Sequence, residues 1–208
     1  TVSITGTPVL FGGFTHTSGN VSITAPSVTL LGIYNSSYTF NAPTLAFNDV
    51  AINSANNHDV VSFNFGGGLN TNGNLTLSST FVASSLNSGT IRVRGNLAAT
   101  GGAAWNGNAT ISLEGPTNST ITQAATTTFG NGTLAVSKTS ATVTQLSAIS
   151  PRQNMNISAT STYNMNGLNL AVTGTLTNNG VLSRGTSPAC GTLTTGFLTG
   201  NPAVCPPP

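Results

Sequence analysis

Short runs along the chain alternate apolar residues with small polar ones, at residues 21–24, 75–77, 91–93, 111–113, 134–136 and 168–170. Alternation with a period of two is typical of a strand that buries one of its faces. Glu, Lys, Met and Gln, which favour helices, are rare, whereas Thr, Val, Ile, Asn and Gly recur throughout. The pattern predicts an all-β fold with almost no helix.

The turns before many strands share a sequence pattern, in which Gly is followed by Asn or Thr and then by an apolar residue. It occurs at residues 19–21, 73–75, 89–91, 95–97, 107–109, 132–134 and 174–176, and it suits a tight corner that leads into a strand. The apolar anchors Leu75, Ile91, Ile111, Leu134 and Ile157 follow at steps of 16, 20, 23 and 23 residues. Steps of this size match one coil of a solenoid, so we expect a parallel β-helix, or β-solenoid, with terminal caps.

A second architecture fits the same strands. An antiparallel β-sandwich or jelly roll, completed by a donated strand, is also built from many short strands with alternating faces. Alternation alone does not separate the two folds.

Composition favours the solenoid, because polarity comes almost entirely from uncharged residues. Ser, Thr, Asn and Gly make up 107 of the 208 residues, and only 4% of the chain is charged, against about 25% in an ordinary domain. In stacked coils Asn and Thr can form ladders, whereas like charges would lie about 4.8 Å apart. The rarity of charge is therefore expected of a stack.

Residues 174–182, with the sequence GTLTNNGVL, resemble a sequence pattern common in right-handed parallel β-helix passenger domains, such as those of filamentous-haemagglutinin-like adhesins and autotransporters. The resemblance extends loosely over about residues 15–185. It implies a parallel β-helix and an extracellular location, and it carries no catalytic motif.

Three segments are predicted. Residues 15–186 form the β-solenoid domain, and residues 1–14 form an N-terminal strand that is either the first coil or cap, or a docking segment given to a neighbouring subunit. Residues 187–208 depart from the pattern and contain Cys190 and Cys205, which we expect to form a disulfide that closes a C-terminal cap or tail.

Several features indicate an exported protein. The chain begins at Thr1 without a leader, which predicts a mature product whose targeting segment has been removed. No apolar run approaches the roughly 20 residues that span a bilayer, and a disulfide suits an oxidising compartment. A net charge of +2 with scattered cations gives no stripe for phosphates, so nucleic acid is not an expected partner.

The residues that carry chemistry are too few for an active site. Asp49, Asp59 and Glu114 are the only carboxylates of side chains, and glycoside hydrolysis usually needs two of them across the scissile bond. His58 precedes Asp59, but no Gly-x-Ser-x-Gly elbow accompanies the pair. His16 is interpreted as a polar strand or loop residue. We expect no enzyme activity, no cofactor and no intrinsic metal ion.

The remaining candidate sites involve sugars, which could be bound by aromatic side chains or attached covalently to asparagines. Trp105, Phe63 and Phe65 are interpreted as core residues more readily than as a sugar-binding platform. Seven Asn-x-Ser/Thr triplets are candidate glycosylation sites, and they begin at Asn20, Asn35, Asn74, Asn108, Asn118, Asn131 and Asn156. Covalent glycans are therefore possible partners of the chain.

The features together favour an extracellular structural protein that associates with copies of itself into a filament, fibril or surface layer. The alternative is an adhesin-type binding module, in which Tyr34, Tyr38 and Trp105 contact glycans or host surfaces.

Overall fold

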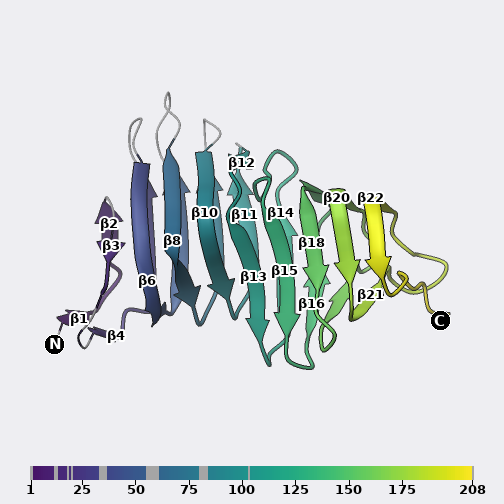
Figure 1. The fold of residues 1–208 in the computed structure, drawn as a ribbon, viewed down its shortest axis with the longest axis horizontal. Coiled ribbons are helices and arrows are strands. Elements are labelled where there is room, and N and C mark those ends of the chain that lie inside the picture. The colour runs from purple at the N-terminus through teal and green to yellow at the C-terminus, as the bar shows by residue number, and fades with distance from the viewer. Residues whose placement is uncertain are drawn as a thin grey trace.

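Successive coils of the chain stack on one another along a single axis, so that each coil pairs with the coil before it and the coil after it (Figure 1). The computed structural model describes residues 2–11, 14–17, 19, 21–32, 37–54, 61–79, 84–102 and 104–207. Within these residues it is a β-solenoid of about eight turns without a helix, and every strand pair is parallel. The expected solenoid is confirmed, and the antiparallel alternative is wrong.

Two large sheets form the sides of the stack. The wide sheet has 11 strands: β3 (Phe14–Thr15), β6 (Ser37–Phe47), β8 (Ser62–Thr71), β10 (Ser84–Val93), β12 (Trp105–Asn106), β13 (Thr110–Gly115), β15 (Thr133–Lys138), β17 (Ile149–Arg152), β18 (Asn154–Ile157), β20 (Leu170–Asn178) and β22 (Leu193–Gly200). The wide sheet faces the viewer in Figure 1.

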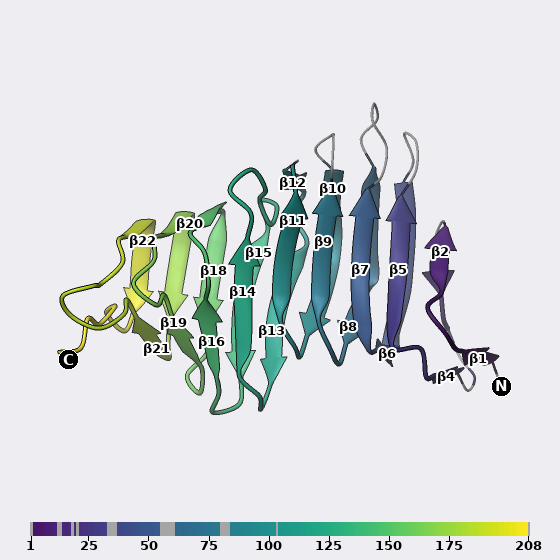
Figure 2. The same cartoon turned by 180° about the vertical axis from the view of Figure 1, so that it is seen from behind.

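The narrow sheet has 9 strands and faces the viewer in Figure 2: β2 (Val9–Phe11), β5 (Ser27–Gly32), β7 (Asp49–Ser54), β9 (Leu75–Ser79), β11 (Leu97–Gly101), β14 (Ser119–Gln123), β16 (Thr142–Gln145), β19 (Thr162–Asn164) and β21 (Val181–Ser183). A separate pair, β1 (Val2–Ile4) and β4 (Val21–Ile23), lies at the N-terminal end.

The sequence anchors locate some rungs of the stack and misplace others. Ile91, Ile111 and Leu134 are in register in the wide sheet, as expected. Leu75 belongs to the narrow sheet, because each coil supplies a strand to both sheets. Ile157 lies two residues beyond Met155, which is the actual partner of Leu134.

Strand pairing continues into both terminal segments. β1 pairs with β4, and β2 pairs with β5, so the N-terminal segment contributes to the first coil. β22 pairs with β20 along the wide sheet, and Val204 forms a bridge with Ser183 on the narrow-sheet side. Residues 193–204 therefore form the last coil of the stack, and in the structure they lie beside β20 and β21 as a further rung.

The interior is apolar and contains an aromatic stack. Phe40 lies 6.2 Å from Phe63 and 5.8 Å from Phe65 between ring centroids, and Trp105 lies 6.1 Å from Phe63. All four side chains are buried. Stacked rings of this kind contribute about 0.5–1.5 kcal/mol per pair beyond the burial of area, so they strengthen the contact between coils.

A ladder of side chains at the entry to the narrow sheet joins one coil to the next. The backbone N–H of Asn74 donates to Asp49 Oδ1 (2.7 Å), that of Asn96 donates to Asn74 Oδ1 (2.9 Å), and that of Thr120 donates to Asn96 Oδ1 (2.8 Å). Each amide oxygen thus satisfies a backbone donor of the following coil. Asn74 and Asn96 both belong to the Gly-Asn-apolar pattern of the sequence.

Gly95 is required beside the ladder, because the two corners approach closely. Its N–H donates to the carbonyl of Gly73 (2.8 Å), and a Cβ added to Gly95 would lie 2.5 Å from that same oxygen. No side chain fits this contact.

Among the described residues, the charged side chain of Lys138 lies inside the stack. Lys138 is only 1% exposed, and its ammonium donates to the carbonyl oxygens of Arg94 (3.1 Å) and Glu114 (2.6 Å) and to the hydroxyl of Ser119 (2.5 Å). Three donors therefore meet three acceptors from the two preceding coils. Burial lowers the pKa of Lys138, and the charge of Glu114 opposes this shift.

Lys138→Met should change how stability depends on pH. Because the pKa of Lys138 is lowered in the folded chain, the unfolded chain binds more protons between that lowered pKa and the ordinary value of 10.5. The free energy of unfolding of the wild type should therefore rise with pH across this window, relative to Lys138→Met. Urea titrations of both proteins from pH 7 to pH 10.5 measure the difference, and parallel pH profiles would contradict it.

Tyr163 gives a second pH effect of opposite sign. Its phenol is fully buried, donates to Gln145 Oε1 (3.1 Å), and has a pKa raised by burial. Above pH 10 the unfolded phenol ionises while the folded one stays protonated, so the wild type should lose stability there. Tyr163→Phe should remove this loss, at a cost of about 1–2 kcal/mol at neutral pH from the unpaired Gln145 oxygen. Denaturation at pH 7 and pH 11 tests both effects.

Candidate functional site

The carboxylates occupy separate structural positions. Asp49 begins β7 and is engaged in the corner ladder, and Glu114 lies near the end of β13, where Oε1 is 3.5 Å from Arg92 Nε. Asp59 and His58 lie outside the described residues. Asp49 therefore binds the backbone of the following turn.

His16 is a loop residue held by local contacts. Its Nε2 lies 3.2 Å from the carbonyl of Gly19, and its Nδ1 lies 3.4 Å from Thr44 Oγ1. Across the part of the chain that the structure describes, no three His, Cys, Asp or Glu side chains gather in a way that could hold a metal ion. That part also holds no helix of the length and apolarity needed to cross a bilayer.

Trp105, Phe63 and Phe65 are core residues, each with 0% of its surface exposed. The core interpretation is confirmed. The hypothesis that Trp105 contacts an external ligand is wrong, because the ring is enclosed by the neighbouring coils. Tyr38 is half-buried, with its ring centroid 5.8 Å from that of Phe63. Tyr34 lies outside the described residues.

The candidate glycosylation sites differ in accessibility. Asn20 and Asn35 lie outside the described residues. Asn74 is half-buried, and its Nδ2 donates to Asp49 Oδ2 (3.4 Å). The remaining four are exposed, namely Asn108, Asn118, Asn131 and Asn156.

The predicted disulfide is present between Cys190 and Cys205, with the two Cα atoms 6.0 Å apart. It ties the turn after β21 to the residues that follow β22. Hydrogen bonds reinforce the connection, since Arg184 N donates to the carbonyl of Val204 (2.8 Å) and Ser187 N to that of Pro206 (3.0 Å). The disulfide therefore holds the last coil against the previous one.

The outer edge of β22 is the first of two open ends. β22 pairs with β20 on one side, and no other described strand pairs with it. An apolar row runs through the interior of the wide sheet and ends at this edge, and it consists of Ile91, Ile111, Leu134, Met155, Leu176 and Leu198. Its first five members are at most 1% exposed, whereas Leu198 is 40% exposed. Leu198 is therefore an interior position without a covering coil.

Near the opposite end of the stack, part of the edge of β6 has no partner strand among the described residues. β6 spans residues 37–47, but among the described residues β3 pairs only with its Phe40 and Asn41. The other edge of β6 pairs with β8. The last strands of the wide sheet, β3 at the N-terminal end and β22 at the C-terminal end, lie at opposite ends of the molecule in Figure 1.

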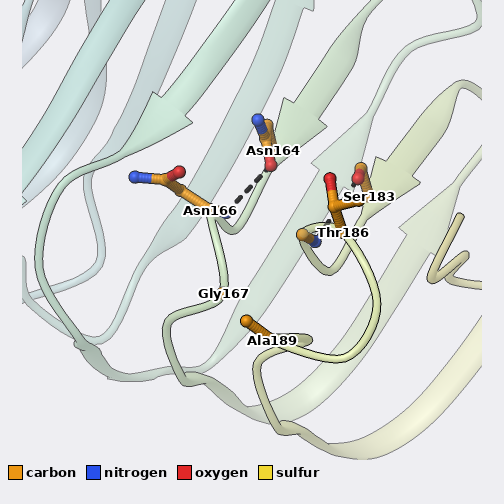
Figure 3. A pocket seen from close by; sticks show the side chains of 7 residues that line it. Asn164, Asn166, Gly167, Ser183, Thr186 and Ala189 are labelled. Carbon is orange, nitrogen blue, oxygen red and sulfur yellow. Dashed lines mark hydrogen bonds between the residues drawn. The ribbon is translucent and has the colours of Figure 1, made fainter. Parts of the chain in front are cut away.

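A small pocket lies beside the disulfide-linked turns (Figure 3). Its volume is about 250 Å³, and it is lined by Asn164, Asn166, Gly167, Ser183, Gly185, Thr186 and Ala189. Its polar atoms bind the turns themselves, since Asn166 N donates to Asn164 Oδ1 (2.8 Å) and Gly185 N to Ser183 Oγ (3.4 Å). We interpret the pocket as a product of turn geometry.

A larger hollow of about 390 Å³ lies on the outside of the wide sheet and is lined by Asn108, Asn131, Gln153 and Thr173. We call it the amide groove. The four residues come from four successive coils, at steps of 23, 22 and 20 residues. Sequence analysis found Asn108 and Asn131 only as glycosylation candidates and missed Gln153. The coil period is the signal that could have joined them.

Comparisons with known proteins give no relative. No family model matches the chain, and no curated protein or solved structure matches it.

Replacing both cysteines should destabilise the last coil locally. The disulfide joins residues 15 apart, and closing a loop of this size stabilises the folded state by about 3 kcal/mol in the chain-entropy model. In Cys190→Ser/Cys205→Ser, hydrogen exchange should accelerate in β22 and leave β9 protected. Reductant should reproduce the effect in the wild type and change nothing further in the double variant. Equal protection of β22 with and without the disulfide would contradict the prediction.

Proposed function

We propose that the chain is an extracellular structural subunit that stacks end to end with copies of itself, and so builds a filament, fibril or surface layer. The observation that carries the proposal is the open edge of β22, where a continuous interior row ends in the exposed Leu198. Such edges are templates for pairing with another chain unless they are covered.

A second copy is the occupant that fits this edge. Since all the described strand pairs are parallel, a copy displaced along the stack axis keeps its strands in the same direction and continues the same sheets. At the N-terminal end of that copy, the short strand β3 covers only Phe40 and Asn41 of β6, so part of the β6 edge has no partner strand among the described residues. The contact joins two different surfaces of the same chain, and a contact of this type extends into a fibre unless rotation closes a ring.

The surface chemistry supports association. The net charge is +2, and the chain has five basic and three acidic side chains in 208 residues, so little repulsion opposes the approach of copies. Phe197 of β22 and Val204 are also exposed, by 73% and 43%. Burial of a leucine-sized side chain contributes about 1.5–3 kcal/mol, which is tenfold or more in an association constant.

An extracellular location is supported by two features. The Cys190–Cys205 disulfide is of a kind that persists in oxidising compartments. The sequence of residues 174–182 resembles a pattern common in β-helix passenger domains of surface proteins, as described above.

Leu198→Lys should block assembly, because it places a charge where the next coil would bury an apolar side chain. Thr194→Lys is the matched control, since Thr194 lies on the same strand but pairs with Ala171 on the outer face and is exposed. Electron microscopy and sedimentation velocity over a concentration series should show rods for the wild type and Thr194→Lys. Leu198→Lys should stay monomeric at concentrations at least about tenfold higher. A wild type that is monomeric throughout would refute the proposal.

Mixing the proteins tests the head-to-tail geometry. A Leu198→Lys subunit keeps an intact first coil, so it should add once to the β22 end of a wild-type rod and stop growth there. Small fractions of the variant should therefore shorten the rods. If rods keep their length while the variant is excluded, or if they associate side by side, end-to-end stacking is wrong.

A further inference from the structure

We propose that the amide groove, formed by Asn108, Asn131, Gln153 and Thr173, binds a neutral oligosaccharide lying along the stack axis. The inference is independent of self-assembly, because the groove lies on the outer face of the wide sheet and the open edges lie at the ends of the stack.

The groove amides differ from the other amides of the coil corners in having no structural partner. Elsewhere the side-chain oxygens of corner asparagines accept backbone N–H groups of the next coil, as seen for Asn74, Asn96, Asn118, Asn154 and Asn169. The side chains of Asn108, Asn131 and Gln153 are exposed and form no hydrogen bond with any described residue. Their donors and acceptors are therefore free for a ligand.

The backbone creates the hollow into which these side chains are placed. Asn108 lies between β12 and β13, and Gln153 lies between β17 and β18, where the strands of the wide sheet are interrupted. Asn131 follows Gly130, which has a φ of 86° that favours glycine. A Cβ added to Gly130 would lie 2.9 Å from the carbonyl oxygen of Asn106. The interruption therefore recurs in three successive coils, whereas Thr173 lies within β20, where its pairing with β22 shifts in register.

The spacing and the chemistry both favour a sugar chain. Neighbouring strands lie about 4.8 Å apart, so the four coils present polar groups along roughly 14 Å. Each carboxamide both donates and accepts hydrogen bonds, as a sugar hydroxyl does. None of the four lining residues is charged or apolar. Among the described residues, the lining therefore offers no charge to a phosphate and no apolar surface to an apolar ligand.

Binding should be measured on the unglycosylated Leu198→Lys protein, so that the outcome does not depend on assembly. The probes are linear hexasaccharides of glucose and of N-acetylglucosamine, followed by chemical-shift changes and calorimetry. Asn131→Ala and Gln153→Ala should each weaken binding by about three- to tenfold, as expected for the loss of a hydrogen bond. Asn156→Ala is the matched control, because Asn156 is an exposed amide of the wide sheet that does not line the groove. It should bind like the parent protein.

Three results would overturn the inference. They are the absence of binding to either hexasaccharide at millimolar concentration, unchanged binding in the Asn131→Ala/Gln153→Ala double variant, and a covalent glycan on Asn108 or Asn131 in native material. The last result would mean that the groove holds a sugar attached to the chain itself. Circular dichroism confirms that each variant keeps its fold.

Discussion

The parallel, in-register pairing of each coil with its neighbours is the constraint on which the rest of the structure depends. Where the register is kept from coil to coil, a side chain meets the equivalent side chain of the next coil at about 4.8 Å. Aliphatic and aromatic residues gain from this proximity, as in the row that ends at Leu198 and in the stack around Phe63. Amides gain as well, because an oxygen of one coil binds a backbone donor of the next. Like charges would not.

This constraint explains where the few charges are found. Arg92 and Glu114 come from adjacent coils and face one another with opposite sign, which in an exposed pair contributes little to stability but avoids repulsion. Lys138 is buried because three acceptors from the preceding coils surround its ammonium. Both arrangements need partners that lie 19 to 44 residues away in sequence, and a repeated charge in the same row would lack them.

The same pairing leaves two kinds of surface with unpaired groups, namely open strand edges and amides without partners. Each supports a different proposal. At the β22 end of the stack, the strand edge and the interior position Leu198 have no further coil among the described residues, which favours a second copy as the partner. On the side of the stack, amides that are not used between coils are collected in one groove, which favours a polar ligand. The two surfaces do not overlap, so one filament could present the groove once in every subunit along its length.

The sequence by itself determined the all-β class and favoured the solenoid, because alternation, corner patterns and the shortage of charge are local properties that repeat. Only the structure excluded the antiparallel sandwich. The sequence also identified the Cys190–Cys205 pair and the core character of Trp105, since lone cysteines and rare aromatics have few alternatives. Only the tertiary structure decided which strands share a sheet, because Leu75 and Ile91 look alike in sequence but belong to opposite sides of each coil. The burial of Lys138, the exposure of Leu198 and the free amide of Gln153 were likewise not predictable. Each depends on what the neighbouring coil places beside it, and the period of the coils varies too much for the sequence to fix that register.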